Sequence, residues 1–545
     1  MRHTRTLLLT GAAAASVALM ALTAPVAGQQ GAAGAPVFET SDRCQACHNG
    51  LVTPRGEDAS IGIAWRASMM ANAARDPYWQ AGVRREITQH PSAAAAIEHE
   101  CSACHMPMMR YEAKAAGKLG GVFAHLPIGT GGTRAHAVAA DGVSCTTCHQ
   151  ATPEKLGTRE SFNAGFVVAA PSASGDRTAY GPFDVKPGLA SVMRSATQFV
   201  PLAGAHVQSS DLCATCHTLI THSLGPDGKV VGELPEQVPY LEWRHSRYAA
   251  EQSCQDCHMK AVPDAMPIAS ILGEPREGFR QHDFRGSNFF MPRILNKYRH
   301  ELGVTALPQE LDAAALLAEE FLRGEAATLS VENPRLVSGR LLADITVGNR
   351  GGHKLPTAYP SRRAWLHIAV RDARGAVVFE SGRLEVDGRI RGNDNDADGA
   401  RYEAHHDEIA SPEDVQVYEP ILGDPAGAVT TGLIAAVKYL KDNRILPHGF
   451  DKTTASRDIA VAGDAAADPN FTGGSDGVRL NVPLGGATGP FTVEVELLYQ
   501  PIGFRWAQNL DPYKASMEPA RFLDYYKAMG AASAARLARD VASVQ

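Results

Sequence analysis

The feature that most constrains this chain is a five-residue pattern that uses every cysteine it has. Ten cysteines occur in 545 residues, and all ten fall in copies of C-x-x-C-H. Chance placement of the cysteines and histidines would give on the order of 0.01 copies. The five copies are Cys44/Cys47/His48, Cys101/Cys104/His105, Cys145/Cys148/His149, Cys213/Cys216/His217 and Cys254/Cys257/His258.

The chemistry that explains this spacing is the covalent attachment of haem. Two thiols three positions apart lie on one turn of chain and add to the two vinyl groups of a single haem, while the adjacent histidine binds the iron. A structural zinc site would use two C-x-x-C pairs, four cysteines in all, so five pairs would leave one over. A redox-active dithiol would normally occur once. The sequence therefore predicts five covalently attached haem c groups, with the proximal iron ligands His48, His105, His149, His217 and His258.

The distances between the motifs predict how the haems pack. All five motifs lie between residues 44 and 258, which is too little chain to enclose five haems in separate pockets. We therefore expect the haems to pack against one another and to form much of their own core, within a domain of short helices and long loops. Such a row of haems is suited to carrying electrons.

The ligand on the second side of each iron is harder to assign. Nine other histidines lie in the haem segment, and sequence context ranks His136, His206 and His282 first, with His99 able to serve a neighbouring haem. A weak repeat, W-R-x-S-x-x-A, begins at Trp65 and again at Trp243, and it places Met70 where the second copy has Tyr248. Met70 is a candidate thioether ligand, and a packing role for this methionine is the alternative.

At residues 141–149 and 253–259 the sequence resembles the multihaem cytochrome c superfamily that includes the pentahaem nitrite reductases and the hydroxylamine oxidoreductases. The resemblance spans about residues 40 to 300 and implies a similar haem packing. Two departures argue against those particular reactions. All five motifs here end in His, whereas pentahaem nitrite reductases typically carry one C-x-x-C-K motif, and hydroxylamine oxidoreductases have eight haems.

The C-terminal half has no cysteine and shows periodic patterns. Residues 308–323 have the spacing of an amphipathic helix, and residues 341–347 and 491–497 alternate between apolar and polar side chains as strands do. The pattern predicts an immunoglobulin-like β-sandwich, closed by a helix over residues 519–540. Within it, His353 in the turn G-G-H-K-L-P-T is a candidate to reach a haem, with a turn-stabilising role as the alternative.

An acidic segment in the same half has the opening of a calcium loop. Asp394, Asp396 and Asp398 follow D-x-D-x-D-G, in which alternate carboxylates converge on one hard cation. An EF-hand would require Glu at the twelfth position, where this chain has His405. Calcium is therefore a candidate second cofactor, and a solvated acidic turn is the alternative.

The N-terminus predicts export. Arg2 and Arg5 precede an apolar stretch over residues 7–24, and small residues before Gln29 suit cleavage of a signal peptide. We expect a periplasmic or extracellular protein with no stable membrane span after cleavage. The net charge of −7 gives no reason to expect a nucleic-acid partner.

These observations predict an α+β multidomain protein. The expected parts are a signal peptide (1–28), a pentahaem domain (29–305), a connecting helix (306–325), a β-sandwich (326–518) and a C-terminal helix (519–545). The favoured function is electron relay between redox partner proteins rather than catalysis. Two alternatives stay open: a reductase or oxidase of small nitrogen or sulfur species at one open haem, and a self-associating subunit of an extracellular cytochrome filament.

Overall fold

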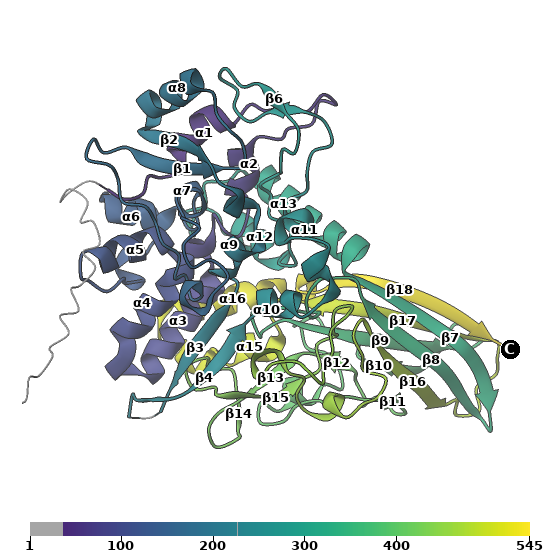
Figure 1. Cartoon of the computed structure of the whole chain (residues 1–545). Coiled ribbons are helices and arrows are strands. Elements are labelled where there is room, and N and C mark those ends of the chain that lie inside the picture. The colour runs from purple at the N-terminus through teal and green to yellow at the C-terminus, as the bar shows by residue number, and fades with distance from the viewer. Residues whose placement is uncertain (1–35, 226) are drawn as a thin grey trace, which may run out of the picture.

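The computed structural model describes residues 36–225 and 227–545 (Figure 1). The predicted signal peptide, residues 1–28, lies outside these ranges. Within them, every helix is too short or too polar to cross a lipid bilayer. Helices and sheets are both abundant, and the fold class is α+β.

The N-terminal half consists of short helices joined by long loops, as the motif spacing predicted. Its three strand pairs are small: β1–β2 is parallel, and β3–β4 and β5–β6 are antiparallel. The helices are α1 (Asp42–His48), α2 (Ile61–Arg66), α3 (Pro77–Gln89), α4 (Ala94–His105), α5 (Pro107–Ala115), α6 (Arg134–Ala140), α7 (Cys145–His149), α8 (Pro187–Thr197), α9 (Ser210–Ala214), α10 (Pro239–Arg244), α11 (Cys254–His258) and α12 (Phe290–Lys297). The strands are β1 (Arg177–Gly181), β2 (Phe199–Ala203), β3 (Leu219–Leu224), β4 (Val230–Gln237), β5 (Met266–Pro267) and β6 (Pro275–Arg276).

Each C-x-x-C-H motif lies on or beside a helical turn. The motifs end α1 and α4, make up the whole of α7 and α11, and run through the end of α9. Ser253 begins α11 with a capping box, in which its hydroxyl accepts from the Asp256 amide and the Asp256 carboxylate accepts from the Ser253 amide. A helical turn places residues i and i+3 on one face, so each pair of thiols points to the same side.

The C-terminal half begins with α13 (Pro308–Phe321), close to the predicted helix over 308–323, and Leu322–Ala326 continue it as a π-helical turn. Two sheets follow, with strand orders β10-β9-β17-β18, where β12 also pairs with β9, and β11-β16-β8-β7. Their strands are β7 (Ala327–Val337), β8 (Arg340–Asn349), β9 (Arg363–Arg371), β10 (Val377–Ser381), β11 (Glu408–Ile409), β12 (Val417–Tyr418), β16 (Ser475–Pro483), β17 (Phe491–Gln500) and β18 (Ala535–Val544). A small third sheet contains β13 (Pro420–Gly423), β14 (Val429–Thr430) and β15 (Lys438–Asp442).

The alternating segments form strands with the predicted faces. In β8 the buried residues are Leu341, Ala343, Ile345 and Val347, and in β17 they are Phe491, Val493, Val495 and Leu497. These side chains belong to one hydrophobic core that both sheets share. An immunoglobulin-like connectivity of the strands stays a prediction.

The predicted closing helix over 519–540 is wrong in its second half. The helix α16 (Met517–Met529) ends early, and residues 535–544 form β18, which pairs antiparallel with β17. Alanine and arginine favour a helix here, but Arg536 and Arg539 form ion pairs with Glu496 and Glu494 of β17. Pairing with the edge of an existing sheet outweighs the local helix propensity.

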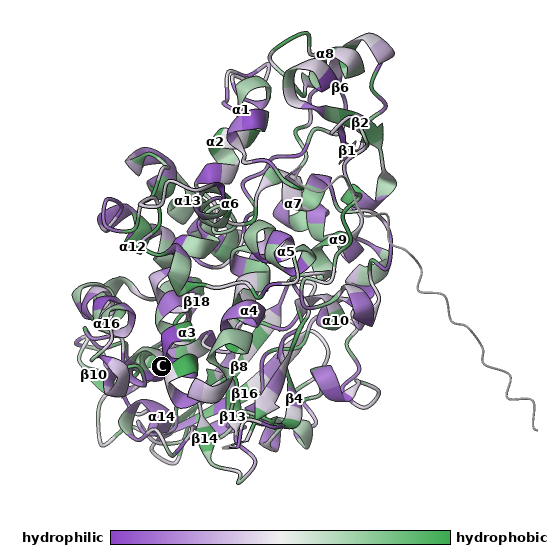
Figure 2. Ribbon diagram, turned by 90° about the vertical axis from the view of Figure 1, so that its left-hand side faces the viewer, coloured by the Kyte–Doolittle hydropathy of each residue, from purple (hydrophilic) through white to green (hydrophobic). Residues whose placement is uncertain are grey.

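The two halves of the chain pack against each other. Helix α16 lies against α3, where Arg84 donates to Glu518 at 2.8 Å. The core of the two sheets also includes Phe289 and Phe290, beside and within α12. Figure 2 shows the motif-bearing helices α1, α7 and α9 above the strands β8, β16 and β13. The remaining helices of the sheet-bearing half are α14 (Asp394–Ala397) and α15 (Phe504–Gln508).

Candidate haem-binding cavity

All five C-x-x-C-H motifs line one cavity of about 1450 Å³. Every cysteine and every histidine of the five motifs contributes to its wall. The ten cysteines are free thiols, so none is committed to a disulfide. Motifs separated by long stretches of sequence are therefore brought to a common space, as the prediction of mutually packed haems requires.

The motif histidines are held in the orientation that an iron ligand needs. A backbone carbonyl faces Nδ1 of four of them: Ile268 at 2.6 Å from His48, Ala73 at 2.9 Å from His105, Tyr180 at 2.6 Å from His149, and Arg285 close to His258. A carbonyl oxygen can only accept, so Nδ1 carries the proton and Nε2 keeps its lone pair. This is the usual outer contact of a metal-bound histidine.

The charge state of these imidazoles also suits iron. Burial lowers the pKa of all five motif histidines, to about 4 for His105 and His217. Metal ions bind the neutral imidazole. All five motif histidines therefore fit haem iron in protonation, and His48, His105, His149 and His258 also fit it in orientation and tautomer.

Two motif histidines face a second imidazole. The ring centroids of His149 and His282 are 6.3 Å apart with planes 22° from parallel, and those of His258 and His353 are 6.2 Å apart with planes at 16°. A metal bonded at about 2 Å to one nitrogen of each ring would separate the centroids by about 6 Å. Both spacings therefore suit one iron held between two histidines.

The second imidazoles share the orientation of the first. Nδ1 of His282 is 3.0 Å from the Arg280 carbonyl, and Nδ1 of His353 is 3.1 Å from the Lys354 carbonyl. Both rings line the cavity. The lone pair is again left on Nε2, so these two residues are suited to ligate iron opposite His149 and His258.

A buried ionic network fixes the turn that carries His353. The Lys354 ammonium is fully buried and donates to Asp442 Oδ2 at 2.6 Å, and Arg444 donates to the same carboxylate at 2.7 and 2.8 Å. Arg444 also pairs with Glu242 of α10 at 3.0 Å, and Glu242 accepts from the Lys354 amide. The network ties the sheet-bearing half to the haem-bearing half beside His353.

The two copies of the weak repeat make the same contact. The Trp65 indole donates to the Val143 carbonyl at 3.0 Å, and the Trp243 indole donates to the Gln252 carbonyl at 2.9 Å. Each carbonyl lies two residues before the first cysteine of a motif. The two copies of the repeat therefore brace their motifs through the same contact.

Tyr248, the counterpart of Met70 in this repeat, also lines the cavity, but its hydroxyl is engaged elsewhere. Its hydroxyl donates to the Arg350 carbonyl at 2.9 Å, and its ring packs near Gly352 in the turn of His353. Met70 itself lines the cavity and remains a candidate ligand.

The other predicted distal histidines lie away from the cavity wall. His206 Nε2 faces the Ala151 carbonyl at 2.9 Å, and Nδ1 of the half-buried His136 is 2.7 Å from the Thr133 hydroxyl. His99 is buried, and its Nδ1 accepts from the Gly120 amide at 2.8 Å, which leaves the proton on Nε2. Among the five distal candidates, the structure places His282 and Met70 at the cavity.

The predicted calcium ligands do not fit a common cation. Both oxygens of Asp396 accept from the buried Arg363 guanidinium, at 2.7 and 2.9 Å. The Asp394 carboxylate pairs with Arg401 at 2.6 Å, and Asp398 accepts from the Ala400 amide at 3.0 Å. The segment forms the one-turn helix α14, which directs the carboxylates to different partners. The calcium loop is therefore not supported by the geometry.

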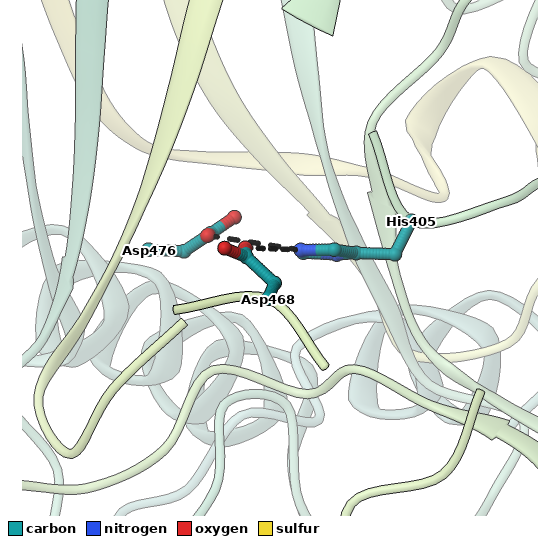
Figure 3. A group of neighbouring side chains, drawn as sticks. All are labelled: His405, Asp468 and Asp476. Carbon is teal, nitrogen blue, oxygen red and sulfur yellow. Dashed lines mark hydrogen bonds and ion pairs between the residues drawn. The ribbon is translucent and has the colours of Figure 1, made fainter. Parts of the chain in front are cut away.

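A second cluster of metal-ligating side chains is a hydrogen-bonded network (Figure 3). Nε2 of the buried His405 lies 3.1 Å from Asp468 Oδ2 and 3.8 Å from Asp476 Oδ1. The side-chain amides of Gln416 and Asn443 face its Nδ1 at 3.0 and 3.1 Å, and their oxygens accept from backbone N–H groups, so both NH₂ groups donate. The proton therefore lies on Nε2, which donates to Asp468 and has no lone pair for a metal.

Comparison with known proteins bears on the fold. No family model matches the chain, and no curated protein matches it. The crystal structure of a penta-heme cytochrome c552 from Thermochromatium tepidum is similar, with 15% sequence identity and a TM-score of 0.52. The match covers 93% of this chain and 99% of that one. This chain therefore shares the fold of that cytochrome over nearly its whole length.

Proposed function

We propose that the protein is a multihaem c-type cytochrome that binds five haems covalently and transfers electrons between redox partners. The observation that carries the proposal is that the ten cysteines and five histidines of the motifs all line one cavity. The cysteines supply thioether attachment, and the motif histidines supply neutral Nε2 ligands. Bound haem supplies the one-electron chemistry of its iron.

The shared cavity favours electron relay. Haems attached within one cavity lie close together, so an electron that enters at one motif has short steps to the others. The similarity to a penta-heme cytochrome over nearly the whole chain supports the same number of haems. We further propose export to the periplasm or the cell exterior, where c-type haem is used by proteins with signal peptides such as the one predicted for residues 1–28.

A second candidate function is catalysis at an open iron. Among the described residues, a second imidazole at ligand spacing faces His149 and His258, and none is found at that spacing from His48, His105 or His217. An iron with an unoccupied second side can bind a small molecule. This observation keeps a multihaem reductase or oxidase as the alternative to a pure relay.

The test is a haem count on protein matured with a c-type haem assembly system. We expect five covalent haems, each adding about 0.6 kDa to the processed chain. The matched control is the double variant Cys254→Ala/Cys257→Ala, which should carry one haem fewer. Fewer than five haems on fully matured wild-type protein would contradict the proposal.

A further inference from the structure

Two buried carboxyl groups differ from the other buried acids of this protein. Ten Asp and Glu side chains are buried in the described part of the chain. Eight of them lie within 4.0 Å of a nitrogen of Arg, Lys or His: Glu242, Asp396, Glu403, Glu419, Asp442, Asp468, Asp476 and Glu518. Within that same part of the chain, Glu86 and Glu236 have no such partner. These two also line the haem cavity, which none of the eight does.

The contacts of the two carboxyl groups leave oxygen atoms free. Glu86, on α3, accepts from the Leu433 amide at 3.0 Å through Oε1, while its Oε2 is buried with no partner in the described structure. Glu236, on β4, accepts from the Thr221 hydroxyl at 2.6 Å through Oε2. Neither residue has the set of donors that would hold a buried carboxylate permanently charged.

The groups around this pair do not neutralise it. Arg85 lies on the same helix and its charge lowers the pKa of Glu86, but its guanidinium donates to Thr431 at 2.7 Å and forms no ion pair with Glu86. His90 lies near Glu86, and the remaining titratable neighbours are the hydroxyls of Tyr78, Tyr359 and Tyr439, whose pKa values burial raises. The thiols of Cys101 and Cys104 also lie close, but they cease to titrate once they form thioethers.

The pair is near enough to a motif to sense a change of charge there. Burial raises the pKa of the Cys101 thiol, and the charges of Glu236 and Glu86 raise it further. A ferric haem carries one more positive charge than a ferrous haem, so reduction removes a charge that would stabilise an ionised carboxylate in this cavity. A buried acid that forms no ion pair is then the group that responds.

We propose that Glu86 and Glu236 form a proton-binding pair that takes up one proton when the haem at the 101–105 motif is reduced. The inference rests on the proposed function, because it requires haem in the cavity. One electron from the redox partner protein converts ferric to ferrous iron, and one proton from solvent forms an O–H bond on the carboxyl pair. No other bond forms or breaks, and the charge of the cavity is unchanged.

The carboxyl pair titrates in the pH range that a redox titration can cover. Burial raises the pKa of both carboxyl groups, to about 7 for Glu236, and the charge of Glu86 adds to the shift at Glu236. Reduction raises the pKa further, so proton uptake occurs between the pKa of the oxidised and that of the reduced protein. One haem potential should therefore fall as pH rises through that window.

The experiment is a redox titration of the haem-loaded protein from about pH 6 to about pH 9. In the wild type we expect one potential to fall by up to about 59 mV per pH unit, which is a tenfold change per unit for one electron. The double variant Glu86→Gln/Glu236→Gln should show a potential independent of pH, close to the low-pH value of the wild type. The control Glu274→Gln changes an exposed acid that also lines the cavity and pairs with Lys186, and it should keep the wild-type slope.

A second measurement covers the case in which the double variant does not fold. Reduced-minus-oxidised infrared difference spectra of the wild type should show a protonated carboxyl band that either single variant, Glu236→Gln or Glu86→Gln, alters. A pH slope that persists in the double variant, or a carboxyl band that neither single variant alters, would overturn the inference and assign the proton to another carboxyl group such as a haem propionate. A spectrum without any such band would also overturn it. Absence of covalent haem would instead overturn the proposed function.

Discussion

His258 and His353 face each other across the cavity with ring centroids 6.2 Å apart and planes at 16°. One belongs to a C-x-x-C-H motif in α11 and the other to a turn after β8. The proposed iron site between them is therefore built from both halves of the chain. Loss of the second histidine ligand at this iron would show that the two halves had moved apart.

Replacing His353 should open one iron. In His353→Ala, the haem held by His258 loses its second imidazole and becomes high-spin, and the reduced protein should bind about one more equivalent of carbon monoxide than the wild type. Magnetic circular dichroism and carbon monoxide titration measure this. The control His300→Ala changes an exposed histidine and should leave both readouts unchanged. Unchanged spectra in His353→Ala would exclude His353 as a ligand.

Met70 has a spectroscopic test. If its sulfur binds ferric iron, the oxidised wild type should show the weak far-red absorbance band that a methionine–haem bond produces, and Met70→Leu should abolish it. Met70→His should lower one haem potential, because imidazole favours ferric iron more than a thioether does. A wild-type spectrum without the band would leave Met70 as a packing residue.

The buried network beside His353 should be costly to break. Asp442→Asn removes the carboxylate shared by Lys354 and Arg444 and leaves two buried cations short of a partner, so we expect a loss of about 3–5 kcal/mol in the free energy of unfolding. Urea denaturation followed by far-UV circular dichroism measures it. The exposed Asp227, which pairs with Lys229, provides the control, and Asp227→Asn should leave the free energy of unfolding essentially unchanged. Equal effects of the two variants would contradict the structural role of the network.

His367 should make stability depend on pH in a defined direction. Burial lowers its pKa, but hydrogen bonds to Glu496 and Glu380, both at 3.3 Å, outweigh burial and raise the pKa above 6.5. The protonated form is thus favoured by folding, so its stabilisation is complete below pH 6.5 and is lost as pH rises through the folded-state pKa. The stability difference between wild type and His367→Gln should therefore shrink on going from acid to alkaline pH. A difference that grows with pH would contradict the assignment.

Calcium should have no effect on thermal stability. Asp396 is committed to Arg363, so the melting temperature of the wild type should be the same with calcium and with a chelator. Asp396→Asn should destabilise the protein equally in both buffers, by about 3–5 kcal/mol, because it leaves the Arg363 charge buried. A calcium-dependent rise in the wild-type melting temperature would restore the calcium loop.

The sequence by itself determined the proposed haem-attachment residues, because covalent attachment requires the two cysteines and the histidine of each motif to be close together in the chain. It also determined which faces of β8 and β17 are buried, because a strand has a fixed period of two. Local patterns of this kind do not depend on what the rest of the chain does.

Only the tertiary structure decided which groups meet across the cavity. His353 faces His258 and His206 turns to a backbone carbonyl because long-range packing, not local spacing, sets those positions. The same holds where neighbours override a local pattern: β17 draws residues 535–544 into a strand, and Arg363 occupies the carboxylate of Asp396. No sequence motif marks Glu86 and Glu236, because what distinguishes them is burial without an ion pair, and the folded surroundings alone decide that.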